Sequence, residues 1–174
     1  VKDLHIAAAS VEPGTGALRG FYGGQDYLKS QINWAVSGGQ PGSTFKAFAL
    51  AAGIKAGFSL RDTFDGNSPF TFQEGVKPVR NLGGGDGQDY GRVNLIKAAE
   101  DSINTAFVDL TMALPNGPKD VLKMAKAMGI PEDNGTRSLD NLRNSPGLAA
   151  NAGIALGSAT VSPINIANGY ATIA

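Results

Sequence analysis

A serine and a lysine at helical spacing are the residues of this sequence best suited to chemistry. Ser43 and Lys46 lie in the segment Pro41-Gly42-Ser43-Thr44-Phe45-Lys46, and apolar residues then recur at the i, i+3, i+4 and i+7 positions from Phe45. Proline and glycine end the preceding segment, so the pattern predicts a helix that begins at or near Ser43. Residues three apart share a helix face, so we expect the hydroxyl and the amine to lie side by side.

This pair is suited to nucleophilic catalysis. A serine hydroxyl must lose its proton before it attacks a carbonyl, and a lysine kept neutral by burial can take that proton. The positive end of the helix dipole would stabilise the developing oxyanion. We therefore expect Ser43 to be a nucleophile and Lys46 to be its base, with Lys46 largely neutral at working pH.

A second polar pair lies at a predicted junction between two helices. Residues 93–100 are expected to form a short helix, Asp101 and Ser102 interrupt it, and apolar residues from Ile103 onward predict another helix. In a non-helical tripeptide, alternate side chains can point the same way. Ser102 and Asn104 would then face one cleft together.

Both pairs also have a purely structural interpretation. Serine and asparagine are favoured N-cap residues, so Ser43, Ser102 and Asn104 could simply cap ordinary helices. Ser-x-x-Lys and Ser-x-Asn are also short enough to arise by chance in a chain of 174 residues. The two motifs alone leave catalysis and capping open.

Composition places the chain among ordinary globular domains. Its 174 residues suffice for one domain with a core, and its 15 basic and 15 acidic residues balance, so no nucleic-acid partner is expected. The absence of cysteine excludes disulfides, a thiol nucleophile and thiolate metal sites. No apolar run approaches the length of a membrane span. The chain starts Val-Lys and ends at Ala174 within an expected helix, so we expect it to be a piece of a longer polypeptide.

Neither the single histidine nor the glycine-rich run of this sequence indicates a cofactor site. His5, the only histidine, falls in a predicted strand without a second histidine or a carboxylate motif, so we interpret it as a structural residue. This interpretation excludes Ser-His-Asp chemistry and histidine metal sites. The glycine-rich run at residues 83–87 lacks the spacing of a nucleotide-binding loop and is interpreted as a turn. No cofactor is expected.

The remaining pattern predicts an α+β fold. Residues 4–11 and 17–23 are expected to form the two strands of a hairpin, and residues 61–92 a long loop with short extended pieces. Helices are expected to begin at Pro118, ending before Gly129, and at Ser162-Pro163, running through Ile173.

Taken in order, these segments resemble the start of a penicillin-binding transpeptidase domain. The landmarks are Asn-Trp-Ala at 33–35, Gln-Pro-Gly-Ser-Thr-Phe-Lys at 40–46, Tyr-Gly at 90–91, Glu-Asp-Ser-Ile-Asn at 100–104, Ala-Leu-Gly at 155–157, Val-Ser-Pro at 161–163 and Asn-Gly-Tyr-Ala-Thr at 168–172. They cover essentially the whole chain and are most similar to the bifunctional, class A branch. The resemblance implies an α/β sandwich of the penicillin-binding and serine β-lactamase type, with an antiparallel sheet flanked by helices and incomplete in this chain.

The resemblance further implies an acyl-serine D,D-transpeptidase that cross-links peptidoglycan stem peptides. Ser43 would attack the penultimate D-alanine carbonyl of a stem peptide ending in D-Ala-D-Ala, with Lys46 as general base. Ser102 would relay a proton toward the leaving D-alanine, and Asn104 would hydrogen-bond the substrate backbone and help fix Lys46. β-Lactam antibiotics would trap Ser43 as an acyl-enzyme. The implied location is the extracytoplasmic face of the bacterial cell membrane, with the anchor outside this chain.

The sequence departs from the family pattern in two places. Gly39 precedes Gln40 where the family usually has arginine, and the family's third motif, Lys-Thr-Gly or Lys-Ser-Gly, is absent. We therefore expect residues 1–174 to be the N-terminal part of a transpeptidase domain, a hairpin plus a helical subdomain. The third-motif strands and a closing helix would follow residue 174. The downstream half of the same protein, as part of this chain or as a separate one, would complete the sheet against the hairpin.

Other functions stay open at this point. A β-lactamase is disfavoured because the class A signature Glu-x-x-Leu-Asn does not occur. A β-lactam-binding sensor domain would keep the same serine without cross-linking peptides. A fragment without the third motif could also be catalytically inactive.

Overall fold

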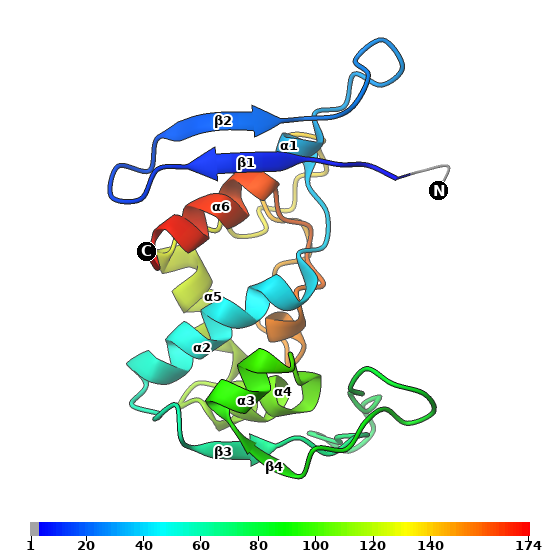
Figure 1. Ribbon diagram of the computed structural model, residues 1–174, viewed down its shortest axis with the longest axis vertical. Coiled ribbons are helices and arrows are strands. Elements are labelled where there is room, and N and C mark those ends of the chain that lie inside the picture. Colours follow the sequence, from blue (N-terminus) through cyan, green and yellow to red (C-terminus); the bar gives the residue numbers. More distant parts are fainter. Residues whose placement is uncertain (1–3) are drawn as a thin grey trace. The chain divides into compact units, whose positions relative to one another are not determined.

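The computed structural model describes residues 4–174 and combines helices with short strands, as the sequence predicts (Figure 1). The strands form two separate two-stranded sheets, β1 with β2 and β3 with β4. The chain divides into two compact units. Unit 1 contains the described residues up to Pro41, Ala125–Ala149 and Ser158–Ala174, and unit 2 contains Gly42–Met124 and Ala150–Gly157.

The hairpin of unit 1 confirms the predicted pair of strands. β1 (Ala8–Val11) and β2 (Leu18–Tyr22) pair antiparallel, with Ala8 opposite Tyr22 and an irregular register between Ser10 and Val11. Within residues 4–174 the two strands pair only with each other, so each leaves one backbone edge unpaired. All residues of β2 are solvent-exposed. The sheet is therefore incomplete in this chain, as predicted.

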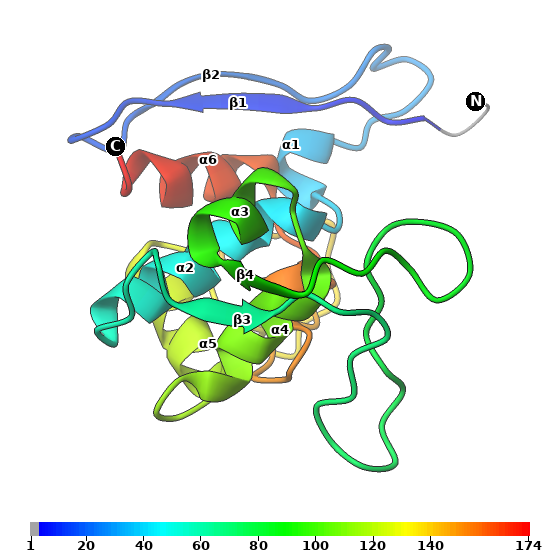
Figure 2. The same ribbon diagram turned by 60° about the horizontal axis from the view of Figure 1, so that its bottom comes forward.

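Helix α6 (Pro163–Ala171) packs against one face of this hairpin (Figures 1 and 2). Ser162 caps the helix, since its hydroxyl accepts a hydrogen bond from the Asn165 N–H at 3.1 Å, and Pro163 occupies the first turn. The predicted start is confirmed. The helix ends at Ala171 and not at Ile173.

Unit 1 also contains a four-residue helix that the sequence did not reveal. α1 (Trp34–Ser37) is capped by Asn33, whose Oδ1 accepts a hydrogen bond from the Ala35 N–H at 3.1 Å. The ring of His5 stacks on the ring of Trp34 with centroids 3.9 Å apart. This contact agrees with a structural role for the histidine.

In unit 2 the predicted helix at Ser43 is confirmed, but its first turn is a 3₁₀ turn. η1 (Gly42–Phe45) runs directly into α2 (Lys46–Lys55), and Gly57 follows with a positive φ of 97°. α2 packs on α4 (Asn104–Ala113), and the helices approach closely at Gly53, where an added Cβ would lie 3.1 Å from Leu110 Cδ1. The buried core of unit 2 includes Phe45, Phe48, Leu95, Phe107 and Leu110.

A second sheet, a further helix and a short 3₁₀ turn pack against α4. β3 (Thr63–Asp65) and β4 (Arg92–Asn94) pair antiparallel at the two ends of the predicted long loop. α3 (Leu95–Glu100) follows β4 directly, so the predicted helix at 93–100 is two residues shorter at its start. α5 (Pro118–Ala127) begins where predicted, and η2 (Ile154–Leu156) is a short 3₁₀ turn. Among the described residues no helix combines the length and apolarity needed to span a membrane.

Candidate active site

Ser43 lies on the exposed surface at the start of the η1–α2 run, and Lys46 lies one turn later and is buried. The start of η1 is fixed by a close contact with Gly157, whose carbonyl accepts a hydrogen bond from the Gly42 N–H at 3.1 Å. Gly157 has a positive φ of 65°, and an added Cβ would lie 2.2 Å from the Gly42 carbonyl oxygen. Only glycine fits there. Gly157 is one of the family landmarks in the sequence, but its contact with Gly42, which holds the turn that carries Ser43, joins residues far apart in the chain and could not be predicted.

The Lys46 amine brings together all four residues that the sequence singled out. Its Nζ lies 3.1 Å from Ser43 Oγ, 2.9 Å from Ser102 Oγ and 2.7 Å from Asn104 Oδ1. It also donates to the Ser102 carbonyl oxygen at 2.6 Å. The two motifs, distant in sequence, therefore meet on one nitrogen. Ser43 lies inside η1 and Ile103 holds the N-cap position of α4, so simple capping by Ser43, Ser102 or Asn104 does not describe the arrangement.

Ser102 has a left-handed backbone conformation with φ of 54°, the one positive φ of a non-glycine residue in the part of the chain described. For an L-residue this costs about 1–2 kcal/mol. The conformation occurs at the break between α3 and α4, and it lets both the carbonyl and the hydroxyl of Ser102 reach Lys46. Strain of this kind is concentrated at functional sites.

The side-chain amide of Asn104 is oriented by a second partner. Its Nδ2 donates to the Arg80 carbonyl oxygen at 2.9 Å, which leaves Oδ1 to face Lys46. A reversed amide would set two donors against each other at Lys46 and two acceptors against each other at Arg80. The hydrogen bonds of Asn104 to Arg80 and to Lys46 therefore fix the orientation of its amide, with Oδ1 facing Lys46.

Burial lowers the pKa of Lys46 from 10.5 to about 8. None of the ion pairs within residues 4–174 involves this lysine, and its Nζ lies over the ring of Phe107, 5.5 Å from the ring centroid. With a pKa of about 8, roughly a tenth of the amine is neutral at pH 7. The expected direction is confirmed, but the expectation of a largely neutral lysine holds only above pH 8.

Comparison with known proteins identifies the domain. Residues 6–174 match the family described as "Penicillin binding protein transpeptidase domain". The chain belongs to this family. It is 35% identical to penicillin-binding protein 1A of Mycobacterium tuberculosis, over 99% of this chain and 20% of that protein, and 30% identical to penicillin-binding protein 1A of Aquifex aeolicus, over 100% of this chain and 22% of that protein. The chain thus spans about a fifth of the length of these relatives.

Solved structures agree with the assignment to penicillin-binding transpeptidase domains. The penicillin-binding protein PonA1 from Mycobacterium tuberculosis superposes with a TM-score of 0.77 at 30% identity, covering 95% of this chain and 41% of that chain. PonA1 in complex with penicillin V gives a TM-score of 0.77 at 29% identity, covering 95% and 42%. The predicted α+β fold of the penicillin-binding type and the similarity to class A proteins are both confirmed.

In this transpeptidase domain, Lys46 has more hydrogen-bond partners than N–H groups. The Ser102 carbonyl and Asn104 Oδ1 can only accept, so they use two N–H groups. A neutral amine has those two N–H groups and one lone pair, and the lone pair can accept a proton from the hydroxyl of either Ser43 or Ser102. A neutral Lys46 is therefore fully paired while its basic lone pair points to a hydroxyl. The arrangement can move a proton between two serines.

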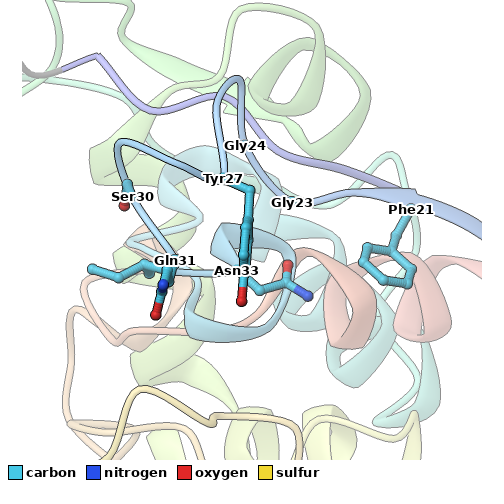
Figure 3. Close-up of a pocket in the computed structure, with 8 residues that line it drawn as sticks. Phe21, Gly23, Gly24, Tyr27, Ser30, Gln31 and Asn33 are labelled. Atoms are coloured by element: carbon cyan, nitrogen blue, oxygen red, sulfur yellow. The ribbon is translucent and has the colours of Figure 1, made fainter.

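A separate pocket in unit 1 holds none of these four residues. It has a volume of about 280 Å³ and lies between the end of β2 and α1, where Phe21, Tyr27 and Gln31 line it (Figure 3). Asn33 also lines it, but its Oδ1 is the cap of α1. The pocket carries no nucleophile–base pair comparable to Ser43 and Lys46.

Proposed function

We propose that this domain is a serine D,D-transpeptidase that cross-links peptidoglycan stem peptides ending in D-Ala-D-Ala. The proposal rests on one observation above all: Ser43 is exposed, and its hydroxyl lies 3.1 Å from the buried amine of Lys46, which forms no ion pair with an acidic residue among residues 4–174. Without a carboxylate to hold its proton, the lysine can serve as a general base. Membership of a transpeptidase family supports acyl transfer as the reaction class.

In the acylation step, the Ser43 proton passes to the lone pair of Lys46 as Oγ attacks the penultimate D-alanine carbonyl carbon. The positive end of the dipole of the η1–α2 run lies at the Ser43 end and would stabilise the developing oxyanion. The tetrahedral intermediate then breaks its C–N bond, and the departing D-alanine amine receives the proton. An amine of a second stem peptide attacks the resulting ester and restores the Ser43 hydroxyl.

Ser102 and Asn104 would have distinct roles in this sequence of steps. Ser102 Oγ lies 2.9 Å from Nζ, so it could pass the proton from Lys46 to the leaving amine. Asn104 Oδ1 accepts one N–H of Lys46 and keeps the lone pair directed at the hydroxyls. Its place at the start of α4 would also let it meet the substrate backbone.

β-Lactam antibiotics would acylate the same serine. The ring amide presents a strained carbonyl to Ser43, and its leaving nitrogen stays tethered after the C–N bond breaks, so the acyl-enzyme persists. PonA1 has been solved in complex with penicillin V, and penicillin-binding protein A of M. tuberculosis as an imipenem acyl-enzyme. The native protein would act on cell-wall peptides at the extracytoplasmic face of the membrane, as the family resemblance of the sequence implies.

The unpaired edges of the hairpin support the further proposal that residues 1–174 are the N-terminal part of the catalytic domain. An isolated two-stranded sheet is marginally stable in water, and Leu4, Ile6 and Tyr22 are exposed on or beside this one. Strands from the downstream half of the protein would pair with the hairpin and bring the Lys-Thr-Gly motif, which this chain lacks. A second oxyanion donor from that motif is worth roughly a hundredfold or more in rate.

The test is turnover of a stem-peptide analogue by the native protein. Release of D-alanine, or formation of a cross-linked dimer, should be abolished by Ser43→Ala and retained by Ser30→Ala, which removes an exposed serine of unit 1. A protein that is acylated by penicillin but releases no D-alanine and forms no cross-link would be a sensor. Turnover that survives Ser43→Ala would refute the assignment of the nucleophile.

A further inference from the structure

The N terminus of α4 is capped from outside the helix. Its own N-cap residue, Ile103, has no side-chain hydrogen bond to offer. Instead, the Thr105 N–H donates to Asn81 Oδ1 at 3.1 Å, across 24 residues of sequence. Asn81 belongs to the long loop between β3 and β4, so the loop supplies what a local Ser, Thr or Asp would normally provide.

Asn81 is at the same time the residue that closes this loop. Its Nδ2 donates to the carbonyl oxygens of Gly66 at 2.8 Å and Gln88 at 2.9 Å, and its backbone N–H donates to Ser68 Oγ at 3.0 Å. The residue is only 7% exposed. Every polar atom of its side chain is thus used, either to hold the loop together or to hold α4.

The residue before Asn81 contacts the residue before Thr105. The Arg80 carbonyl accepts from Asn104 Nδ2 at 2.9 Å, and this bond orients the amide whose Oδ1 meets Lys46. Two consecutive loop residues therefore hold two consecutive residues of α4. A displacement of Asn81 would therefore move the adjacent Arg80 carbonyl, and with it the Asn104 amide whose Oδ1 accepts from Lys46.

We propose that Asn81 is a positioning residue of the active site, which anchors the Arg80 carbonyl so that Asn104 presents its oxygen to Lys46. This inference rests on the proposed function of Ser43 and Lys46. Without the anchor, the Asn104 amide loses its fixed partner and can turn its NH₂ group toward Lys46. An N–H pointing at the amine occupies the lone pair that must take the Ser43 proton.

Gly87 provides an independent way to disturb the same anchor. It has a positive φ of 91°, and an added Cβ would lie 2.6 Å from both the Asn81 carbonyl oxygen and Ser68 Oγ. Gly87→Ala should therefore displace the backbone of Asn81 while leaving its side-chain amide in place. It should weaken the site in the same way as Asn81→Ala.

The experiment compares Asn81→Ala with Asn165→Ala in the native protein. Asn165 is an apt control because it is also 7% exposed and its Nδ2 also donates to two backbone carbonyls, those of Asn141 and Leu142, within unit 1. Benzylpenicillin acylation is followed from pH 6 to pH 10. Asn81→Ala should slow it roughly tenfold to a hundredfold, as expected for a misplaced reacting group, and should lower the midpoint of the pH–rate profile. Asn165→Ala should leave that midpoint unchanged.

Two more measurements make the outcome decisive. Asn81→Asp keeps an oxygen for the Thr105 N–H but sets a buried carboxylate against the Gly66 and Gln88 carbonyl oxygens, so acylation should be slowed at least as much as in Asn81→Ala. Amide hydrogen exchange at the start of α4 should be about threefold to thirtyfold faster in Asn81→Ala and unchanged in Asn165→Ala, whether or not the protein reacts with penicillin. Unchanged exchange, or a rate loss with an unmoved midpoint, overturns the proposal. A wild-type protein without any Ser43 label overturns the proposed function instead.

Discussion

The pH dependence of acylation follows directly from the environment of Lys46. Burial lowers the pKa of the amine to about 8, and the neutral amine is the form that takes the Ser43 proton. The neutral fraction is then about a tenth at pH 7 and about nine tenths at pH 9. We expect the second-order rate of benzylpenicillin acylation to rise about tenfold between these pH values and to level off above them.

The assay measures covalent adduct by intact mass at several times, with penicillin hydrolysis at each pH measured separately. Lys55→Met, at the exposed end of the same helix, is the matched control and should keep the profile. A rate that is flat from pH 7 to pH 9, or that falls, would show that Lys46 is not the base.

The same titration affects stability with a defined sign. Between pH 8 and pH 10.5 the unfolded chain holds a proton on Lys46 that the folded chain does not, so stability rises with pH in this window. The pKa difference corresponds to about 3 kcal/mol. Urea titrations should show wild type gaining this much over Lys46→Met from pH 8 to pH 10.5. A constant difference between the two proteins would contradict the lowered pKa.

Other substitutions test single features of the site. Lys46→Arg keeps a cation that cannot deprotonate, so acylation should fall by about a hundredfold or more while the protein stays folded by circular dichroism. Ser102→Gly should melt a few degrees above Ser102→Ala, since glycine removes about 1 kcal/mol of left-handed strain, with both variants impaired in turnover. Gly157→Ala should lower both the melting temperature and the acylation rate, because the added Cβ collides with Gly42. An unchanged acylation rate would show that the contact between Gly157 and Gly42 does not position Ser43.

Much of this site could be predicted from local spacing. Ser43 and Lys46 are one helical turn apart, and a helix start was readable from Pro41 and the apolar stripe. The break at Ser102 was also visible as a polar interruption between two apolar patterns. These features depend only on residues close in sequence.

What the sequence could not give depends on contacts between distant residues. Asn81 has no local feature that marks it as the cap of α4, and nothing near Gly157 shows that it abuts Gly42. The left-handed φ of Ser102 could not be predicted from its residue type. A glycine or asparagine at this position would have indicated such a conformation, but a serine does not. α1 has four residues, too few to show a helical period.

The central claim, that Ser43 is the acylated nucleophile, is tested most directly by mapping the site of the penicillin label. The native protein is treated with benzylpenicillin, digested, and sequenced by mass spectrometry. We predict one adduct, on the peptide that contains Ser43, and its complete loss in Ser43→Ala. Label on another serine, or label that persists in Ser43→Ala, would contradict this account of the site.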